Sequence, residues 1–129
     1  MRYYFQKTLF NVNFDEAIEK VTEELKKEGF GILTEIDVQA TLKKKLDVDF
    51  RKYQILGACN PPFAYKALQA EIHIGAMLPC NVVVMEKDDG KINVSAVDPE
   101  SSMMAVGNND LKPVAKEIKK KLERVIKNL

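Results

Sequence analysis

The chain has 129 residues, of which 46% are hydrophobic and 30% are charged. This length suits one domain that buries a core of its own, and the composition is that of a soluble globular protein. Twenty basic residues against 19 acidic residues leave a net charge of +1, so no overall field points to nucleic acid or to an anionic membrane.

The N-terminus and the cysteine count indicate a compartment. Residues 1–7 lack the apolar core of a signal peptide, and no run approaches the roughly 20 apolar residues of a membrane span. Two cysteines without a secretory pattern are typical of free thiols in a reducing environment. We therefore expect a cytoplasmic protein.

The N-terminal third predicts a strand, a helix and a second strand. Residues 2–11 carry aromatic and aliphatic side chains typical of a strand. Asn13 and Glu16 have the spacing of a capping box, and Gly29 supplies a helix stop. Residues 30–36 predict the next strand, so the chain is expected to begin with a βαβ unit and a right-handed crossover.

The middle of the chain alternates helix and strand. Asp37 is placed to cap a short helix that ends at Leu46, and a third strand follows at 51–59. Two prolines fit the opening of a helix over 61–70, and residues 71–78 predict a loop.

The C-terminal part predicts a hairpin and a long helix. Residues 80–86 are almost continuously apolar, which indicates a strand covered on both faces. Asp88-Asp89-Gly90 predicts the turn to a strand at 91–97, and an amphipathic helix is expected from Asp110 to the end. The prediction is a single α+β domain over 1–129, with a mixed sheet of about five strands and about four helices.

Several motifs arrive in an order that resembles a known family. The stretches are 36–43, 53–61 and 74–84, followed by Val97-Asp98-Pro99, Met103-Met104 and Gly107-Asn108. They resemble the family called domain of unknown function 302 (DUF302) over essentially the whole chain. The resemblance implies a compact α+β domain that self-associates and has no established activity. The family's recurrent Cys-Asn-Pro and Leu-Pro-Cys motifs match Cys59-Asn60-Pro61 and Leu78-Pro79-Cys80.

The two cysteines are the best candidates for chemistry. A helix that begins at Pro61 would direct N–H groups toward Asn60 and Cys59 and would favour a thiolate there. The alternative is that Asn60 caps the helix while Cys59 and Cys80 pack as small buried residues. Antiparallel pairing of the third and fourth strands would bring the two thiols to one edge, and parallel pairing would separate them by roughly 25–30 Å.

A soft-metal site is a weaker hypothesis. His73 could join Cys59 and Cys80, with Met77, Met103 and Met104 as further soft donors. The spacing matches no zinc motif, so a surface histidine is the favoured interpretation. We expect no cofactor, and no zinc required for folding.

The remaining polar motifs favour ordinary structural roles. Residues 98–102 predict a turn into a short helix, with one wall of a ligand pocket as the functional alternative. The lysine-rich C-terminal helix and Lys43-Lys44-Lys45 are read as solvated faces, because no stacking aromatic residues accompany them. Neither a nucleic-acid nor a membrane partner is expected.

The sequence therefore predicts a ligand-binding or interaction module with a pocket near 57–63, 74–81 and 98–104. The expected ligand-binding residues are Cys59, Asn60, Pro61, Cys80, Asp98 and Met103. The alternatives are thiol chemistry at Cys59, as sulfur or acyl transfer or redox sensing, and soft-metal binding. Absence of a nucleophile with a nearby base argues against a self-contained enzyme, although the question stays open. Aromatic residues on both faces of the first strand (Tyr3, Tyr4, Phe5 and Phe10) predict a homodimer.

Overall fold

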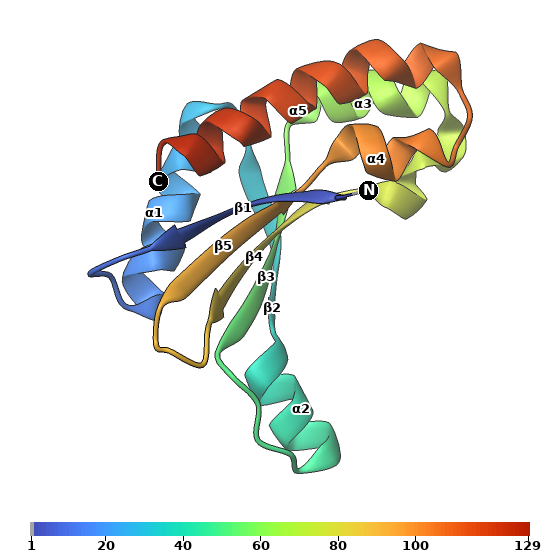
Figure 1. Cartoon of the computed structure of the whole chain (residues 1–129). Coiled ribbons are helices and arrows are strands. Elements are labelled where there is room, and N and C mark those ends of the chain that lie inside the picture. The colour runs from blue at the N-terminus through green and yellow to red at the C-terminus, as the bar shows by residue number, and fades with distance from the viewer. Residues whose placement is uncertain (1) are drawn as a thin grey trace.

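The computed structural model describes residues 2–129 and contains a five-stranded sheet with helices stacked on one side of it (Figure 1). The elements in chain order are β1 (Tyr4–Leu9), α1 (Phe14–Lys27), β2 (Gly31–Asp37), α2 (Val38–Leu46), β3 (Tyr53–Cys59), α3 (Pro61–Ala70), the 3₁₀ helix η1 (Ile72–Met77), β4 (Cys80–Glu86), β5 (Ile92–Val97), α4 (Pro99–Met104), the 3₁₀ helix η2 (Asn109–Leu111) and α5 (Lys112–Lys127). The predicted α+β class, five strands and β-α-β beginning are confirmed. The expected loop at 71–78 contains η1. No helix in residues 2–129 combines the length and apolarity that a bilayer crossing needs.

The sheet has the strand order β1-β5-β4-β3-β2, and each neighbouring pair is antiparallel. The expected mixed sheet is therefore wrong. β1 and β2 do run in the same direction, but α1 carries the chain across the sheet and leaves these two strands at opposite edges. Because they are never hydrogen-bonded to each other, the β-α-β unit contributes no parallel pair.

Helix α1 begins and ends through local interactions. The Asn13 side chain accepts from the Glu16 N–H at 2.8 Å, and the Glu16 carboxylate accepts from the Asn13 N–H at 3.3 Å, which completes the predicted capping box. Gly29 has a positive φ of 85°, and the Phe30 N–H returns to the Leu25 carbonyl at 2.9 Å. This is a glycine-terminated Schellman end.

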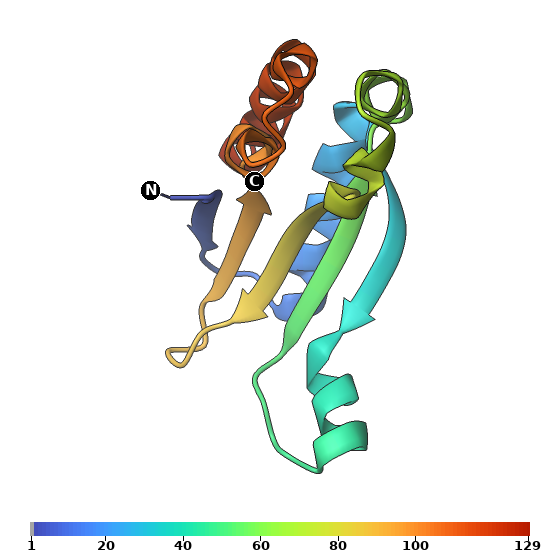
Figure 2. The same ribbon diagram turned by 90° about the vertical axis from the view of Figure 1, so that its right-hand side faces the viewer.

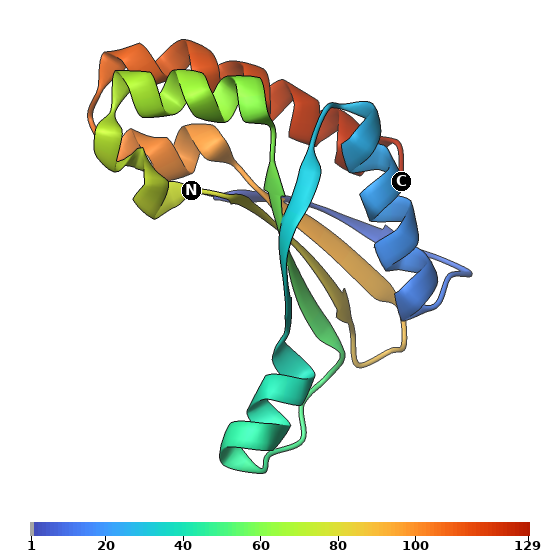
Figure 3. The same cartoon turned by 180° about the vertical axis from the view of Figure 1, so that it is seen from behind.

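The helix-covered face of the sheet holds the core. Helices α1 and α5 pack on it, and Figure 3 shows α5 running across above the strands and α1 standing beside them. Fully buried strand residues on this face include Leu56, Val82, Val84 and Val94. Lys7, at the edge of the same face, donates to the carbonyls of Lys127 and Leu129 at the end of α5. These bonds fix the C-terminal end of α5 against β1.

The opposite face is open. Figure 2 shows this face toward the viewer. The strands lie in front of α1, α2 lies below them, and α3 and α5 lie above them. On β4, Val82 and Val84 are buried, whereas Asn81 is exposed and Val83 is half-buried. The expectation that residues 80–86 are covered on both faces is therefore wrong, because all the packing helices lie on one side.

Helix α2 forms an arm at the far end of β2 and β3 (Figure 1). The Asp37 carboxylate caps it by accepting from the Ala40 N–H at 2.9 Å, as predicted. None of its residues is buried, and Leu46 is 66% exposed. The arm therefore owes little of its order to the core.

Candidate functional site

The larger cavity lies between α4 and the beginning of α5 and has a volume of about 630 Å³. Local caps build its walls. Asp98 begins α4 by accepting from the Glu100 N–H at 3.0 Å, and Asn108 begins η2 by accepting from the Asp110 N–H at 2.9 Å. The Asn108 amide also donates to the Ala70 carbonyl at 2.9 Å, which ties this loop to the end of α3. The cavity is thus formed by consecutive elements, α4, η2 and the beginning of α5, and Asn108 ties them to α3, 38 positions earlier in the chain.

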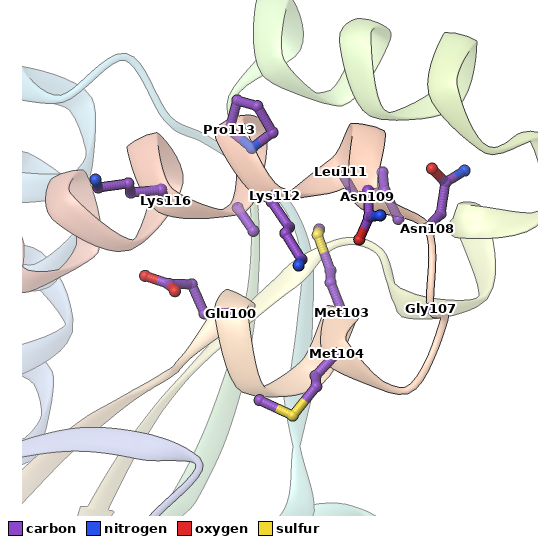
Figure 4. Close-up of a pocket in the computed structure, with 11 residues that line it drawn as sticks. Glu100, Met103, Met104, Gly107, Asn108, Asn109, Leu111, Lys112, Pro113 and Lys116 are labelled. Atoms are coloured by element: carbon purple, nitrogen blue, oxygen red, sulfur yellow. The ribbon is translucent and has the colours of Figure 1, made fainter.

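Its lining is mainly apolar with a polar rim. The lining residues are Glu100, Met103, Met104, Gly107, Asn108, Asn109, Leu111, Lys112, Pro113, Ala115 and Lys116. Figure 4 shows Met103 extending from α4 toward α5, with the Lys112 amine between the two helices and Met104 turned outward. Met103 is buried and Met104 is 62% exposed. Flexible methionine side chains of this kind adapt to apolar ligands of different shapes.

Two lysines give this cavity a positive rim. Within residues 2–129, neither Lys112 nor Lys116 has a carboxylate within 4.0 Å. The one acidic lining residue, Glu100, lies 3.8 Å from Lys119 and is partly neutralised by it. The rim therefore offers unpaired cationic groups to an anionic ligand.

The charge order in α5 supports the same conclusion. Helix α1 has acids in its first turn and lysines in its last turn, the order that complements the helix dipole. Helix α5 has no acid in its first turn, begins with Lys112, and has no side-chain cap. A lysine at a helix N-terminus opposes the dipole, so Lys112 adds positive potential to this end of α5, and Asp110 in η2, two residues earlier, offsets part of it.

Asp98, a predicted ligand-binding residue, has a structural role. It is buried, does not line the cavity, and its second oxygen lies 3.2 Å from the Lys119 amine. The hydrogen bond with Asp98 raises the pKa of Lys119 above its ordinary value. Asp98 thus caps α4 and joins it to α5.

A smaller cavity of about 240 Å³ contains both cysteines. Its lining residues are Phe30, Leu33, Ala58, Cys59, Asn60, Ala64, Leu68, Leu78, Pro79, Cys80 and Ile118. Antiparallel pairing of β3 with β4 sets Ala58 opposite Cys80, so the end of one strand meets the beginning of the other. Of the two topologies considered from the sequence, this is the one that brings the cysteines to one edge.

The two thiols differ in environment. Cys80 is buried on the helix-covered face, and burial raises its pKa to about 11, with a smaller contribution from nearby Cys59. Cys59 is half-buried, and both thiols are free. Cys80 is consequently a neutral thiol near pH 7.

Asn60 and Pro61 do not make the expected helix-end site. Asn60 makes no side-chain cap, and its amide instead donates to the Glu28 carbonyl at 3.0 Å across the fold. Pro61 is exposed and lines neither cavity. Because prolines occupy positions 61 and 62, Phe63 is the first residue of α3 with an N–H. The beginning of α3 therefore has fewer free N–H groups near Cys59 than a helix without these prolines would have.

Of the suggested soft-metal ligands, Cys59 and Cys80 line the same cavity, and neither His73 nor a methionine lines it with them. His73 lies exposed on η1. Across residues 2–129, no group of three or more His, Cys, Asp or Glu side chains could hold a metal ion.

The single predicted pocket is two cavities that share no lining residue. Cys59, Asn60 and Cys80 line the smaller one, and Met103 lines the larger one. The sequence assigned Lys112 and Lys116 to the solvated face of the last helix, whereas the structure places them on the rim of the larger cavity. Two lysines four positions apart at the beginning of that helix are the signal in the sequence.

Comparisons with known proteins agree over almost the whole chain. The model of the family described as "Domain of unknown function DUF302" matches residues 5–129. A solved structure, described as an uncharacterized conserved protein DUF302 from Bacillus stearothermophilus, is 29% identical, with a TM-score of 0.90 and 98% of each chain covered. A search of curated proteins found no match.

Proposed function

Because the chain belongs to the DUF302 family, whose function is unknown, we propose from the geometry that it is a ligand-binding module for small anionic amphiphiles. The ligand class is an apolar body carrying a carboxylate or a similar anionic group. The observation that carries this proposal is the 630 Å³ cavity with a methionine-rich lining and two unpaired lysines on its rim.

The size and lining of the cavity support this ligand class. Small-molecule sites commonly enclose about 300–1,000 Å³, with mostly apolar walls and a few polar groups. The apolar part of a ligand would lie mainly against Met104 and Pro113, which are exposed, with the almost fully buried Met103 and Leu111 behind them, and its anionic group would face Lys112. Asn108 already uses its amide and its side-chain oxygen within the protein, so it acts as a wall rather than as a ligand donor.

The experiment uses two fluorescent probes with similar apolar bodies, the anion 8-anilinonaphthalene-1-sulfonate and the uncharged N-phenyl-1-naphthylamine. Lys112→Met removes the charge and keeps an apolar stem. It should weaken binding of the anion about fivefold, the effect of losing one partly exposed ion pair, and leave the neutral probe unchanged. Met104→Ala should weaken the binding of both probes, because it removes an apolar side chain of the cavity that both probes contact.

The matched control is Lys20→Met, on the exposed surface of α1. It makes the same change of side chain and net charge away from the cavity. The proposal fails if Lys112→Met and Lys20→Met reduce binding of the anion equally, or if neither probe binds the native protein.

Thiol chemistry at Cys59 is the second candidate function. It is favoured by one observation, that two cysteines 21 positions apart in sequence line one largely apolar cavity. The difference between the half-buried Cys59 and the buried Cys80 makes Cys59 the proposed reactive group. Iodoacetamide labelling, which should modify Cys59 before Cys80, tests it.

A further inference from the structure

The strand positions on the open face of the sheet carry no charged side chain, although the Arg2 guanidinium lies 5.5 Å from the ring of Tyr4 at one corner. Apart from the Gly31–Cys59 pair beyond the register shift in β2, the five strands assign fourteen residues to it: Tyr4, Gln6, Thr8, Thr34, Ile36, Tyr53, Ile55, Gly57, Asn81, Val83, Met85, Asn93, Ser95 and Val97. An ordinary protein surface has about 25–35% charged residues, so about four of these positions would be charged on a typical solvent-facing side. The chain itself is 30% charged, yet near this face its charges lie at the margins, as with Arg2 over Tyr4 and Arg51 at the end of β4.

Half of these residues are apolar or aromatic, and they form continuous rows. In the middle row Val83 lies between Ser95 and Ile55, and Ile36 at the edge is 47% exposed. Met85 and Tyr53 pair in the next row. Uncharged, partly apolar surface that no helix of residues 2–129 covers is typical of an interface.

We propose that this face binds the same face of a second copy of the chain, so that two sheets pack against each other across a two-fold axis. In such an isologous interface, each residue near the axis meets its own counterpart. A charged residue there would meet a like charge, which is destabilising, whereas valine, isoleucine and serine meet themselves without penalty. An uncharged face meets this requirement of self-complementarity.

The open face alone is smaller than a stable interface requires, which indicates that the arm also contributes to the contact. Five strands about 4.8 Å apart, each about 20 Å long, present a flat area of roughly 500 Å². A stable interface buries about 800 Å² on each partner. The arm formed by α2 and residues 47–52 carries exposed Leu46, Val48 and Phe50, and the Phe50 ring lies 6.0 Å from that of Tyr53 on the open face. These residues extend the apolar surface beyond the strand ends.

Other occupants fit this face less well. Nucleic-acid binding depends on basic side chains that contact phosphates, and the fourteen positions include none. Pairing through the edge strand β2 would bring Glu35 and Asp37 close to the same acidic residues of the second copy. Face-to-face packing avoids both difficulties.

The experiment measures the dimer dissociation constant of the full chain by analytical ultracentrifugation. The native protein should dimerise at micromolar concentration. Val83→Lys places a charge in the middle row and should raise the dissociation constant at least tenfold with an unchanged circular dichroism spectrum. Leu46→Ser, on the arm, should raise it by a smaller factor. Lys20→Glu, on the exposed surface of α1 on the helix-covered side of the sheet, changes charge away from the open face and should have no effect.

If Val83→Lys does not fold, Ser95→Lys replaces it, because Ser95 occupies the neighbouring position in the same row. A native protein that is monomeric at 100 µM overturns the proposal. So does a folded lysine variant at position 83 or 95 that dimerises as tightly as the native chain, which would place the contact on the β2 edge or elsewhere.

Discussion

The helix-covered face and the open face of the sheet alternate residue by residue along the same strands. On β3, Leu56 is fully buried under the helices, while Ile55 beside it is half-buried on the open face. Both residues are apolar and suit a strand equally well. The comparison shows that apolar content identifies a strand, whereas the amphipathic helices α1 and α5 decide which of its faces becomes core.

The largest expected effect tests this difference on β3. Leu56→Ala should lower the free energy of unfolding by about 2–5 kcal/mol, because it removes buried methyl groups and leaves a cavity. Ile55→Ala should cost less than about 1 kcal/mol in dilute solution, since its side chain is already partly in water. Urea titrations of both variants measure the contrast. Equal losses at all protein concentrations would contradict it, while a loss for Ile55→Ala that grows with concentration would support dimerisation through the open face.

The open face is tightly packed at Gly57, where side chains of Thr34 and Pro79 lie close to the backbone. A Cβ at this position would lie 2.7 Å from Pro79 Cγ and closer still to Thr34 Oγ1. Gly57→Ala should therefore destabilise the fold by about 3 kcal/mol through overpacking. Gly31→Ala, on the neighbouring strand, meets no atom within 4 Å and should change stability by less than about 0.5 kcal/mol. Thermal unfolding of the two variants provides the measurement, and similar melting temperatures would refute the crowding.

The two cysteines extend the comparison to chemistry. Near neutral pH, iodoacetamide should modify Cys59 before Cys80, because burial raises the pKa of Cys80 to about 11 and keeps it protonated. Peptide mass spectrometry over time measures the order. Cys80→Ser should cost roughly 1–3 kcal/mol through burial of a poorly paired hydroxyl, whereas Cys59→Ser should preserve the fold. Faster labelling of Cys80, or inertness of both until unfolding, would remove the thiol-chemistry hypothesis.

The smallest expected effect concerns an ion pair away from the open face, between Arg124 on α5 and Glu28 after α1. Arg124 on α5 donates to Glu28 after α1 at 2.8 and 3.1 Å, and this hydrogen bond lowers the pKa of Glu28 below its ordinary value of 4.5. A lowered pKa means that the pair stabilises the folded state above about pH 4.5 and that this stability is lost as the pH falls further.

Glu28→Gln should therefore lower stability near pH 7 by at most about 1 kcal/mol, as for other partly exposed ion pairs. The difference between the variant and the native protein should vanish at low pH. Chemical denaturation at pH 7 and pH 3 measures both values. A difference that is unchanged between the two pH values would show that the pair contributes no charge-dependent stability.

The elements themselves follow from interactions close in sequence. The capping box of Asn13 and Glu16, the stop at Gly29 and the double proline that opens α3 each act within a few residues, so the sequence predicted these helix ends well. The antiparallel register of the sheet could not be predicted in this way. Strands at 4–9 and 92–97 pair across more than 80 residues, and no local pattern reports that choice.

The candidate sites show the same division between local sequence signals and long-range packing. The sequence identified Cys59, Cys80 and Met103 as residues of interest by their type and spacing. The sequence suggested that Asn60 caps α3. In the folded protein the Asn60 amide instead donates a hydrogen bond to the Glu28 carbonyl, 32 positions away. The charge order of α5 is visible in the sequence, yet only the packing of α4 against α5 makes a cavity beside Lys112. Local hydrogen bonds and turn chemistry determine the elements of this protein, whereas long-range packing decides where its cavities and its uncovered face lie.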